Sequence, residues 1–72
     1  LGANQVTSTI SNGASTLVSK FTISEPEAGR RSEEIYRRAR KALGPDAPQY
    51  EVLAKYGELL EQYIHANIPT ED

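Results

Sequence analysis

Residues 17–27 read LVSKFTISEPE, and this stretch decides the fold that the sequence predicts. Its first eight residues are rich in β-branched and aromatic types, which favour a strand. Alternation places Phe21 and Ile23 on one face and Lys20 and Thr22 on the other, as a half-buried strand requires. These eight residues therefore predict a short strand with one apolar face and one polar face.

A helix start follows the predicted strand without a gap. Ser24 is a hydroxyl N-cap, Pro26 stands in the first turn, and Glu27 lies three residues after the cap, which together form a capping box. Gly44 and Pro45 end the helix, because glycine suits the left-handed stop and proline cannot continue the helix. The sequence therefore predicts a first helix between these two signals.

A second helix is predicted from the Asp46 cap and Gln49 to about Ala66. Gly57 lies in its middle and costs about 1 kcal/mol relative to alanine. A close crossing of another helix at that point would explain the cost. One face of this helix is apolar at spacings of four, three and four, and it carries Leu53, Gly57, Leu60 and Ile64.

The remaining segments are polar. Residues 1–16 are dominated by Gly, Asn, Gln, Ser and Thr, so we predict a flexible arm, because so little apolar surface cannot offset the entropy of ordering. The alternative is a strand from Gln5 to Ile10 that pairs with the next strand through the Asn12-Gly13 turn. Residues 69–72 are predicted to be a tail.

The composition bounds the possible functions. A chain of 72 residues makes one domain with a thin core, so we expect a homodimer or a partner chain. There is no cysteine and only one histidine, and no glycine-rich phosphate loop or catalytic set of residues is present, so we expect no metal, no cofactor and no enzyme activity. No apolar run is long enough to span a membrane, and the lack of cysteine fits a cytoplasmic protein.

The net charge of −2 is divided unevenly along the chain. Residues 25–43 hold six basic and four acidic side chains, which gives 6 − 4 = +2. Residues 44–72 hold one basic and six acidic side chains, which gives 1 − 6 = −5. A weakly basic front half therefore precedes an acidic tail half, and this asymmetry bears on where a nucleic acid could bind.

A strand, a capped helix, a Gly/Pro turn and a second capped helix, in this order and at these lengths, resemble the ribbon-helix-helix family of DNA-binding proteins. The resemblance covers residues 17–68 and predicts a mostly α-helical fold, with one short strand and two helices per chain in an intertwined homodimer. It implies sequence-specific binding of double-stranded DNA, as a transcriptional repressor or as a plasmid partition protein that binds a centromere-like site. The arm before the strand would be available to a partner protein.

The resemblance also implies roles for particular residues. The outward face of the paired strands, with Val18, Lys20 and Thr22, would contact bases. The DNA phosphates would be held by residues at the helix starts, namely Arg30, Arg31, Ala47 and Gln49. The core of the dimer would be formed by Phe21, Ile23, Leu53, Gly57, Leu60 and Ile64.

Two alternatives remain open at this point. In a second register of the same family, Gln5 to Ile10 form the ribbon, residues 17–23 become helical, the second helix opens near Gly29, and the helix after Pro48 is an added oligomerisation element. In a different class, the chain is a small protein-interaction module, such as an antitoxin, a viral accessory protein or a complex subunit. Such a module would dock through the amphipathic C-terminal helix.

Overall fold

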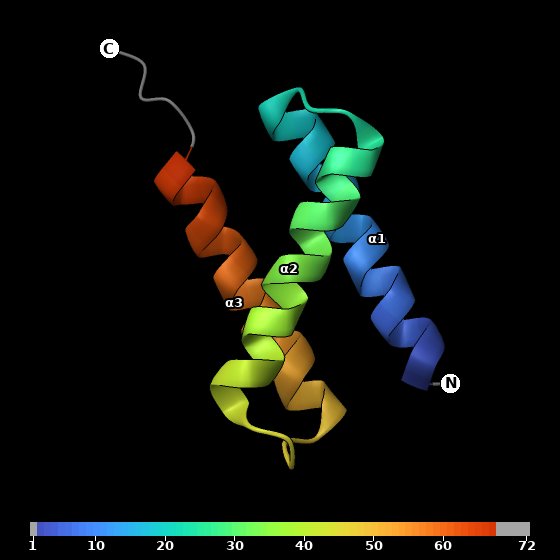
Figure 1. Cartoon of the computed structure of the whole chain (residues 1–72), viewed down its shortest axis with the longest axis vertical. Helices are drawn as coiled ribbons and strands as arrows, with labels where there is room; N and C mark the ends of the chain where they lie inside the picture. Colours follow the sequence, from blue (N-terminus) through green and yellow to red (C-terminus); the bar gives the residue numbers. More distant parts are fainter. Residues whose placement is uncertain (1, 68–72) are drawn as a thin grey trace.

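The structure, a computed structural model, describes residues 2–67, which form three helices (Figure 1). Helix α1 spans Gly2–Phe21, α2 spans Glu25–Leu43 and α3 spans Gln49–Asn67. None of these helices is long and apolar enough to cross a membrane. The predicted tail, residues 69–72, lies outside the described residues.

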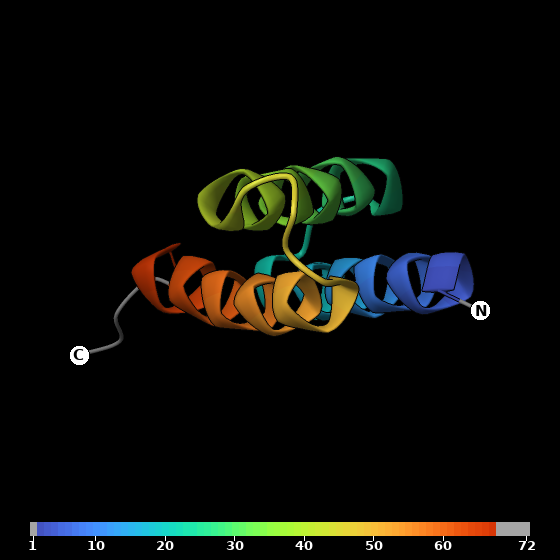
Figure 2. The same ribbon diagram turned by 90° about the horizontal axis from the view of Figure 1, so that it is seen from below.

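The three helices are arranged in two layers. In Figure 1, α1 and α3 run in the same direction and α2 runs back between them, as the two short connections require. Figure 2 shows that α2 forms one layer alone, whereas α1 and α3 lie in the other. Helix α2 therefore contacts both of the other helices along much of its length, and its outward surface is covered by no other part of residues 2–67.

The predicted ribbon-helix-helix fold is wrong, because residues 2–67 contain no strand. Residues 17–21 of the predicted strand continue the helix that begins at Gly2, and residues 22–24 connect it to α2. Residues 2–16 of the predicted flexible arm are the first three-quarters of the same helix. The alternative strand from Gln5 to Ile10 is also helical. The second register is wrong for the same reason, although its expectation of a helix over residues 17–21 agrees with the structure.

Apolar side chains at helical spacing explain why this polar segment is a helix. Val6, Ile10, Leu17 and Phe21 follow one another at helical spacings of four, seven and four residues, and all four are buried or half-buried. The helix ends at Thr22, where φ is +56° and the backbone N–H donates to the Val18 carbonyl at 3.0 Å. The high β propensity of this stretch is overridden, because the helix buries more apolar surface here than an isolated strand can.

The predicted boundaries of α2 are confirmed. The Oγ of Ser24 accepts a hydrogen bond from the Glu27 N–H at 3.3 Å, and Pro26 stands in the first turn. At the other end, Gly44 has a φ of +95° and its N–H donates to the Arg40 carbonyl at 2.9 Å. Both ends of α2 are therefore set by local hydrogen bonds, which Ser24 and Gly44 in the sequence predict.

Helix α3 exists as predicted, but its first turn is organised differently. Asp46 lies in a turn before the helix, and the Pro48 carbonyl accepts from the N–H groups of Glu51 and Val52 at 3.0 and 3.2 Å. Pro48 therefore occupies the position before the helix that Asp46 was expected to take.

Two apolar clusters form the core. The first lies between α2 and α3 and contains Ile35, Ala39, Val52 and Tyr56. The second joins all three helices at the other end of the molecule and contains Leu17, Ala28 and Ile64, with Phe21 and Tyr63 against it. The rings of Phe21 and Tyr63 meet edge to face with centroids 5.7 Å apart. Burial in one chain thus uses most of the apolar residues.

Candidate functional site

The predicted base-reading residues do not form one surface. Val18 is half-buried and packs against the second apolar cluster. Lys20 is exposed near the end of α1, and Thr22 is exposed just beyond that helix. The row of outward side chains that a DNA-reading ribbon needs is absent, because helical geometry turns successive residues by about 100° rather than 180°.

The two arginines predicted to hold phosphates are bound within the chain. The Nη2 of Arg30 lies 2.6 Å from the Glu27 carboxylate, and the Nε of Arg31 lies 2.9 Å from its other oxygen. Arg31 also donates to the Tyr63 hydroxyl at 2.8 Å, which links the start of α2 to the end of α3. These two guanidinium groups hold the pKa of Glu27 below its usual range.

The other two predicted phosphate residues have structural contacts. Ala47 is half-buried against the first apolar cluster. The side-chain amide of Gln49 donates to Gln5 at 3.3 Å and so connects the first turns of α3 and α1. The structure therefore brings the four predicted phosphate residues to two different ends of the molecule.

The predicted dimer-core residues are divided between the interior and the surface. Phe21, Ile23 and Leu60 pack against the second apolar cluster, and Ile64 belongs to it. Leu53 and Gly57 are half-exposed and belong to neither cluster. A Cβ added at Gly57 would meet no atom within 4 Å, so neither α1 nor α2 crosses closely there.

A polar junction lies where the three helices meet, and the sequence analysis missed it. The Ser32 hydroxyl donates to the Ile10 carbonyl at 2.7 Å and also bonds the Tyr56 hydroxyl. Because Ser32 gives its proton to the carbonyl, Tyr56 donates to Ser32. Gly13 is buried beside this junction, and an added Cβ there would overlap the Tyr56 hydroxyl oxygen. The sequence signal for this junction is Gly13, which lies three residues after Ile10 and four before Leu17, on the apolar face of α1.

The junction is structural rather than catalytic. Ser32 is fully buried and Tyr56 is 2 % exposed, so no substrate can reach either hydroxyl. Burial raises the pKa of the Tyr56 phenol, and the Ser32 hydroxyl offsets part of this effect. A serine activated for catalysis needs a nearby base, and the phenol is held in its neutral form.

The raised pKa of Tyr56 predicts alkaline instability. An unfolded tyrosine ionises near pH 10, whereas the folded Tyr56 ionises at a higher pH. The stabilising contribution of the neutral, buried phenol to folding is therefore complete below pH 10 and is lost as the pH rises further. We expect the melting temperature to fall above pH 10 and to fall less steeply in Tyr56→Phe. Melting curves from pH 8 to 11 measure this. Tyr50→Phe, at a side chain that is 72 % exposed, is the control and should follow the unmodified chain. Equal slopes in all three proteins would contradict the prediction.

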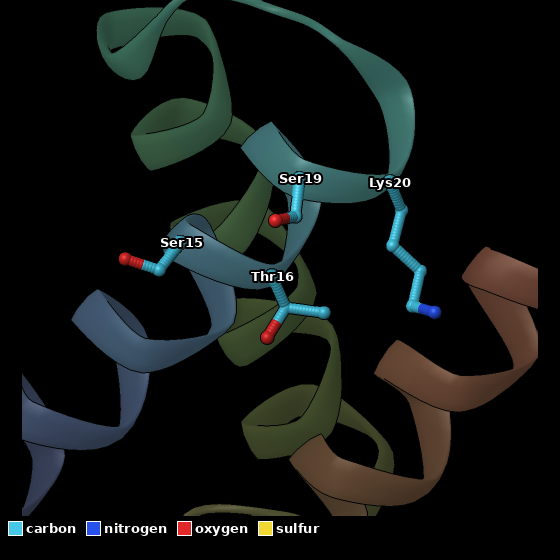
Figure 3. A pocket seen from close by; sticks show the side chains of 4 residues that line it. All are labelled: Ser15, Thr16, Ser19 and Lys20. Atoms are coloured by element: carbon cyan, nitrogen blue, oxygen red, sulfur yellow. The ribbon is translucent and has the colours of Figure 1, made fainter.

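The hollow shown in Figure 3 is an open part of the α1 surface. It is lined by Ser15, Thr16, Ser19 and Lys20. In that view Thr16 and Lys20 extend to the side of α1 on which α3 lies, whereas Ser15 points the other way. Its lining therefore offers three hydroxyl groups and one amine as hydrogen-bonding groups on an open surface.

One surface that no other part of the fold covers is an apolar stripe on α3, here called the α3 stripe. It consists of Tyr50, Leu53, Ala54 and Gly57, which recur at the i, i+3, i+4 and i+7 positions of one helical face. Tyr50 is 72 % exposed, Ala54 is exposed, and Leu53 and Gly57 are half-exposed. This stripe adjoins the buried face of α3 but takes no part in either apolar cluster.

The second such surface is a group of cations on α2, here called the basic cluster. Arg37, Arg38, Arg40 and Lys41 are all exposed, and no acidic residue stands between Glu34 and Asp46. Only Arg37 forms an ion pair with another described residue, at 3.4 Å from Glu33. Within residues 2–67 no group of three His, Cys, Asp or Glu side chains that could hold a metal ion is found.

No known protein family, curated protein or solved structure matches this chain.

Proposed function

We propose that this chain is a self-associating protein-interaction module, in which two copies pack α3 against α3 across Gly57. The observation that carries the proposal is the glycine itself. Gly57 lies in the middle of a 19-residue helix, where it costs about 1 kcal/mol, and an added Cβ there would meet no atom of the described residues within 4 Å. A close approach by a second helix would explain why this position has no side chain.

The residues beside Gly57 supply the apolar contact. Leu53 and Ala54 stand one turn before it and Tyr50 two turns before it, so a helix laid along the α3 stripe would cover all of them. Tyr50 is the one large apolar side chain that residues 4–67 leave mostly exposed. A tyrosine suits an interface, because its ring buries apolar area while its hydroxyl keeps a hydrogen bond.

The charges favour an antiparallel arrangement of the two α3 helices. In an antiparallel pair centred on Gly57, Glu61 of each copy lies one turn from the centre, in opposite directions. The two carboxylates are then about 12 Å apart along the axis, since each residue rises about 1.5 Å. This exceeds the Debye length of about 8 Å at physiological salt. A parallel pair would place the same two carboxylates against each other.

The contact area sets the expected strength. A stable dimer buries about 800 Å² per partner, with some 20–30 residues on each side. The α3 stripe has four residues and the adjoining hydroxyl-rich face of α1 can add only a polar rim, so the dimer should be weak. We expect dissociation in the micromolar range or above, and a melting temperature that rises with protein concentration.

The test is a Gly57→Ala variant, because the two roles of this glycine predict opposite effects. Alanine should stabilise the isolated monomer by up to about 1 kcal/mol, since it favours the helix and meets no neighbour. It should weaken the dimer, because the added methyl group separates the crossing helices. Sedimentation equilibrium gives the dissociation constant, and melting of dilute protein gives the stability of the monomer.

Gly29→Ala is the matched control. Gly29 is also a helical glycine at which an added Cβ meets nothing within 4 Å, but it lies on α2, away from the α3 stripe. It should stabilise the monomer in the same way and leave the dissociation constant unchanged. If the unmodified chain sediments as a monomer at millimolar concentration, or if both variants associate equally, the proposed function is wrong.

A further inference from the structure

We propose that the basic cluster at the C-terminal half of α2 binds the phosphate backbone of double-stranded nucleic acid without reading its sequence. This inference is independent of the proposed self-association, because it uses another helix on the other layer of the molecule. It also differs from the ribbon mechanism, since it needs no strand and none of the residues that were predicted to contact bases.

The position of α2 makes the cluster accessible. This helix forms a layer by itself, and its inner face is occupied by Ala28, Ser32, Ile35 and Ala39 (Figure 2). The basic side chains lie on the rest of its circumference, and three of them line a hollow with Gly44 and Pro45 at the end of the helix. A helix of about 10–12 Å diameter fits the major groove of B-form DNA, which is about 12 Å wide. Helix α2 can therefore approach the phosphates on both edges of that groove.

Intramolecular roles account for only part of this charge. Cations in the last turn of a helix complement its dipole, which explains Arg40 and Lys41. The dipole amounts to about half a negative charge, and its effect ends within that turn, whereas the cluster holds four positive charges. Arg37 and Arg38 lie outside the last turn. Glu33 is 57 % exposed and 3.4 Å from Arg37, so that ion pair contributes little and can be exchanged for a phosphate.

The chemistry of the surroundings selects the duplex among polyanions. Binding to an anionic membrane surface combines basic residues with large apolar side chains that insert, and α2 leaves no large apolar side chain exposed. Binding to single strands uses exposed aromatic rings on which bases stack. The aromatic residue of this half of α2 is Tyr36, which is half-buried and packs against the first apolar cluster. A cluster with three arginines and no exposed ring suits phosphates of a regular duplex.

The test measures binding of the whole chain to a fluorescent duplex of random sequence at about 20 mM salt and upward. Four phosphate contacts predict a slope of log K against log salt of about −3.6, from 0.9 per contact. The variant Arg37→Gln/Arg40→Gln should bind at least tenfold more weakly and reduce the slope by about 1.8. The control Arg30→Gln/Lys55→Gln changes the net charge by the same amount outside the cluster and should bind as the unmodified chain does.

Each other outcome overturns the proposal. Equal losses in the two variants would mean that net charge alone governs binding. Absence of binding at about 20 mM salt would remove the site altogether. Tighter binding to single strands, or to anionic vesicles at equal phosphate concentration, would assign the cluster to a different partner. Circular dichroism of both variants controls for folding, which should be unchanged because all four substituted side chains are on the surface.

Discussion

Gly13→Ala is expected to destabilise the protein by about 3 kcal/mol, the largest effect of any single methyl group added to this chain. The new Cβ would overlap the Tyr56 hydroxyl and lie 3.0 Å from both the Ser32 Oγ and the Tyr56 Cζ. Tyr56 cannot turn away, because its ring is 2 % exposed and packs with Ile35, Ala39 and Val52. Overpacking a closed site of this kind costs about 1–3 kcal/mol, and breaking the buried hydrogen bond adds to it.

A second substitution identifies the cause. Tyr56→Phe removes the oxygen that the new methyl group would strike, so Gly13→Ala/Tyr56→Phe should be more stable than Gly13→Ala alone. Tyr56→Phe by itself should cost only about 1–2 kcal/mol, since Ser32 keeps its bond to the Ile10 carbonyl. Urea unfolding of the four proteins gives the coupling energy. If the two single effects simply add, the helices do not meet at this junction.

Leu17→Ala is also expected to cost about 3 kcal/mol. Leu17 is fully buried and lies in the cluster that joins α1 to Ala28 of α2 and Ile64 of α3. Truncating a buried leucine costs about 2.7–5 kcal/mol, according to how much of the cavity collapses. A 72-residue domain has a total stability of only about 4–11 kcal/mol, so this variant should be partly unfolded well below the melting temperature of the unmodified chain.

Val18→Ala is the matched control for Leu17→Ala. Val18 is the next residue on the same helix, but it is only half-buried, at the edge of the same cluster. We expect it to lose less than about 1 kcal/mol. Thermal and urea unfolding, monitored by circular dichroism at low protein concentration, measure both variants without a contribution from association. Equal losses at the two positions would contradict the orientation of α1 against its neighbours.

Local signals predicted α2 and the extent of α3 successfully because the relevant interactions lie within a few residues. The Ser24 cap bonds an N–H three residues away, and the Gly44 stop bonds a carbonyl four residues away. The candidate surfaces on these helices were likewise visible in part. The prediction already placed Leu53 and Gly57 on one apolar face, and the structure shows that this chain leaves both of them partly uncovered.

The first helix could not be predicted in the same way, because its stability comes from distant residues. Its own composition favours an arm or a strand, with many serine and threonine residues and a β-branched end. What decides its form is the contact of Ile10, Gly13 and Leu17 with residues of α2 and α3 that lie between 28 − 17 = 11 and 64 − 17 = 47 positions further along the chain. A strand needs a second strand to satisfy its backbone, whereas a helix satisfies its own backbone and can place these residues on one face.

The sequence by itself determined where α2 starts and stops, that α3 follows it, and how charge is divided between the two halves of the chain. These properties depend on neighbouring residues, whose hydrogen bonds and charges are the same in any fold. Only the tertiary structure decided that residues 2–21 are helical and that Arg31 donates to the Tyr63 hydroxyl across two helices. It alone also decided which face of α3 stays open, because burial depends on which surfaces meet once all three helices are in place.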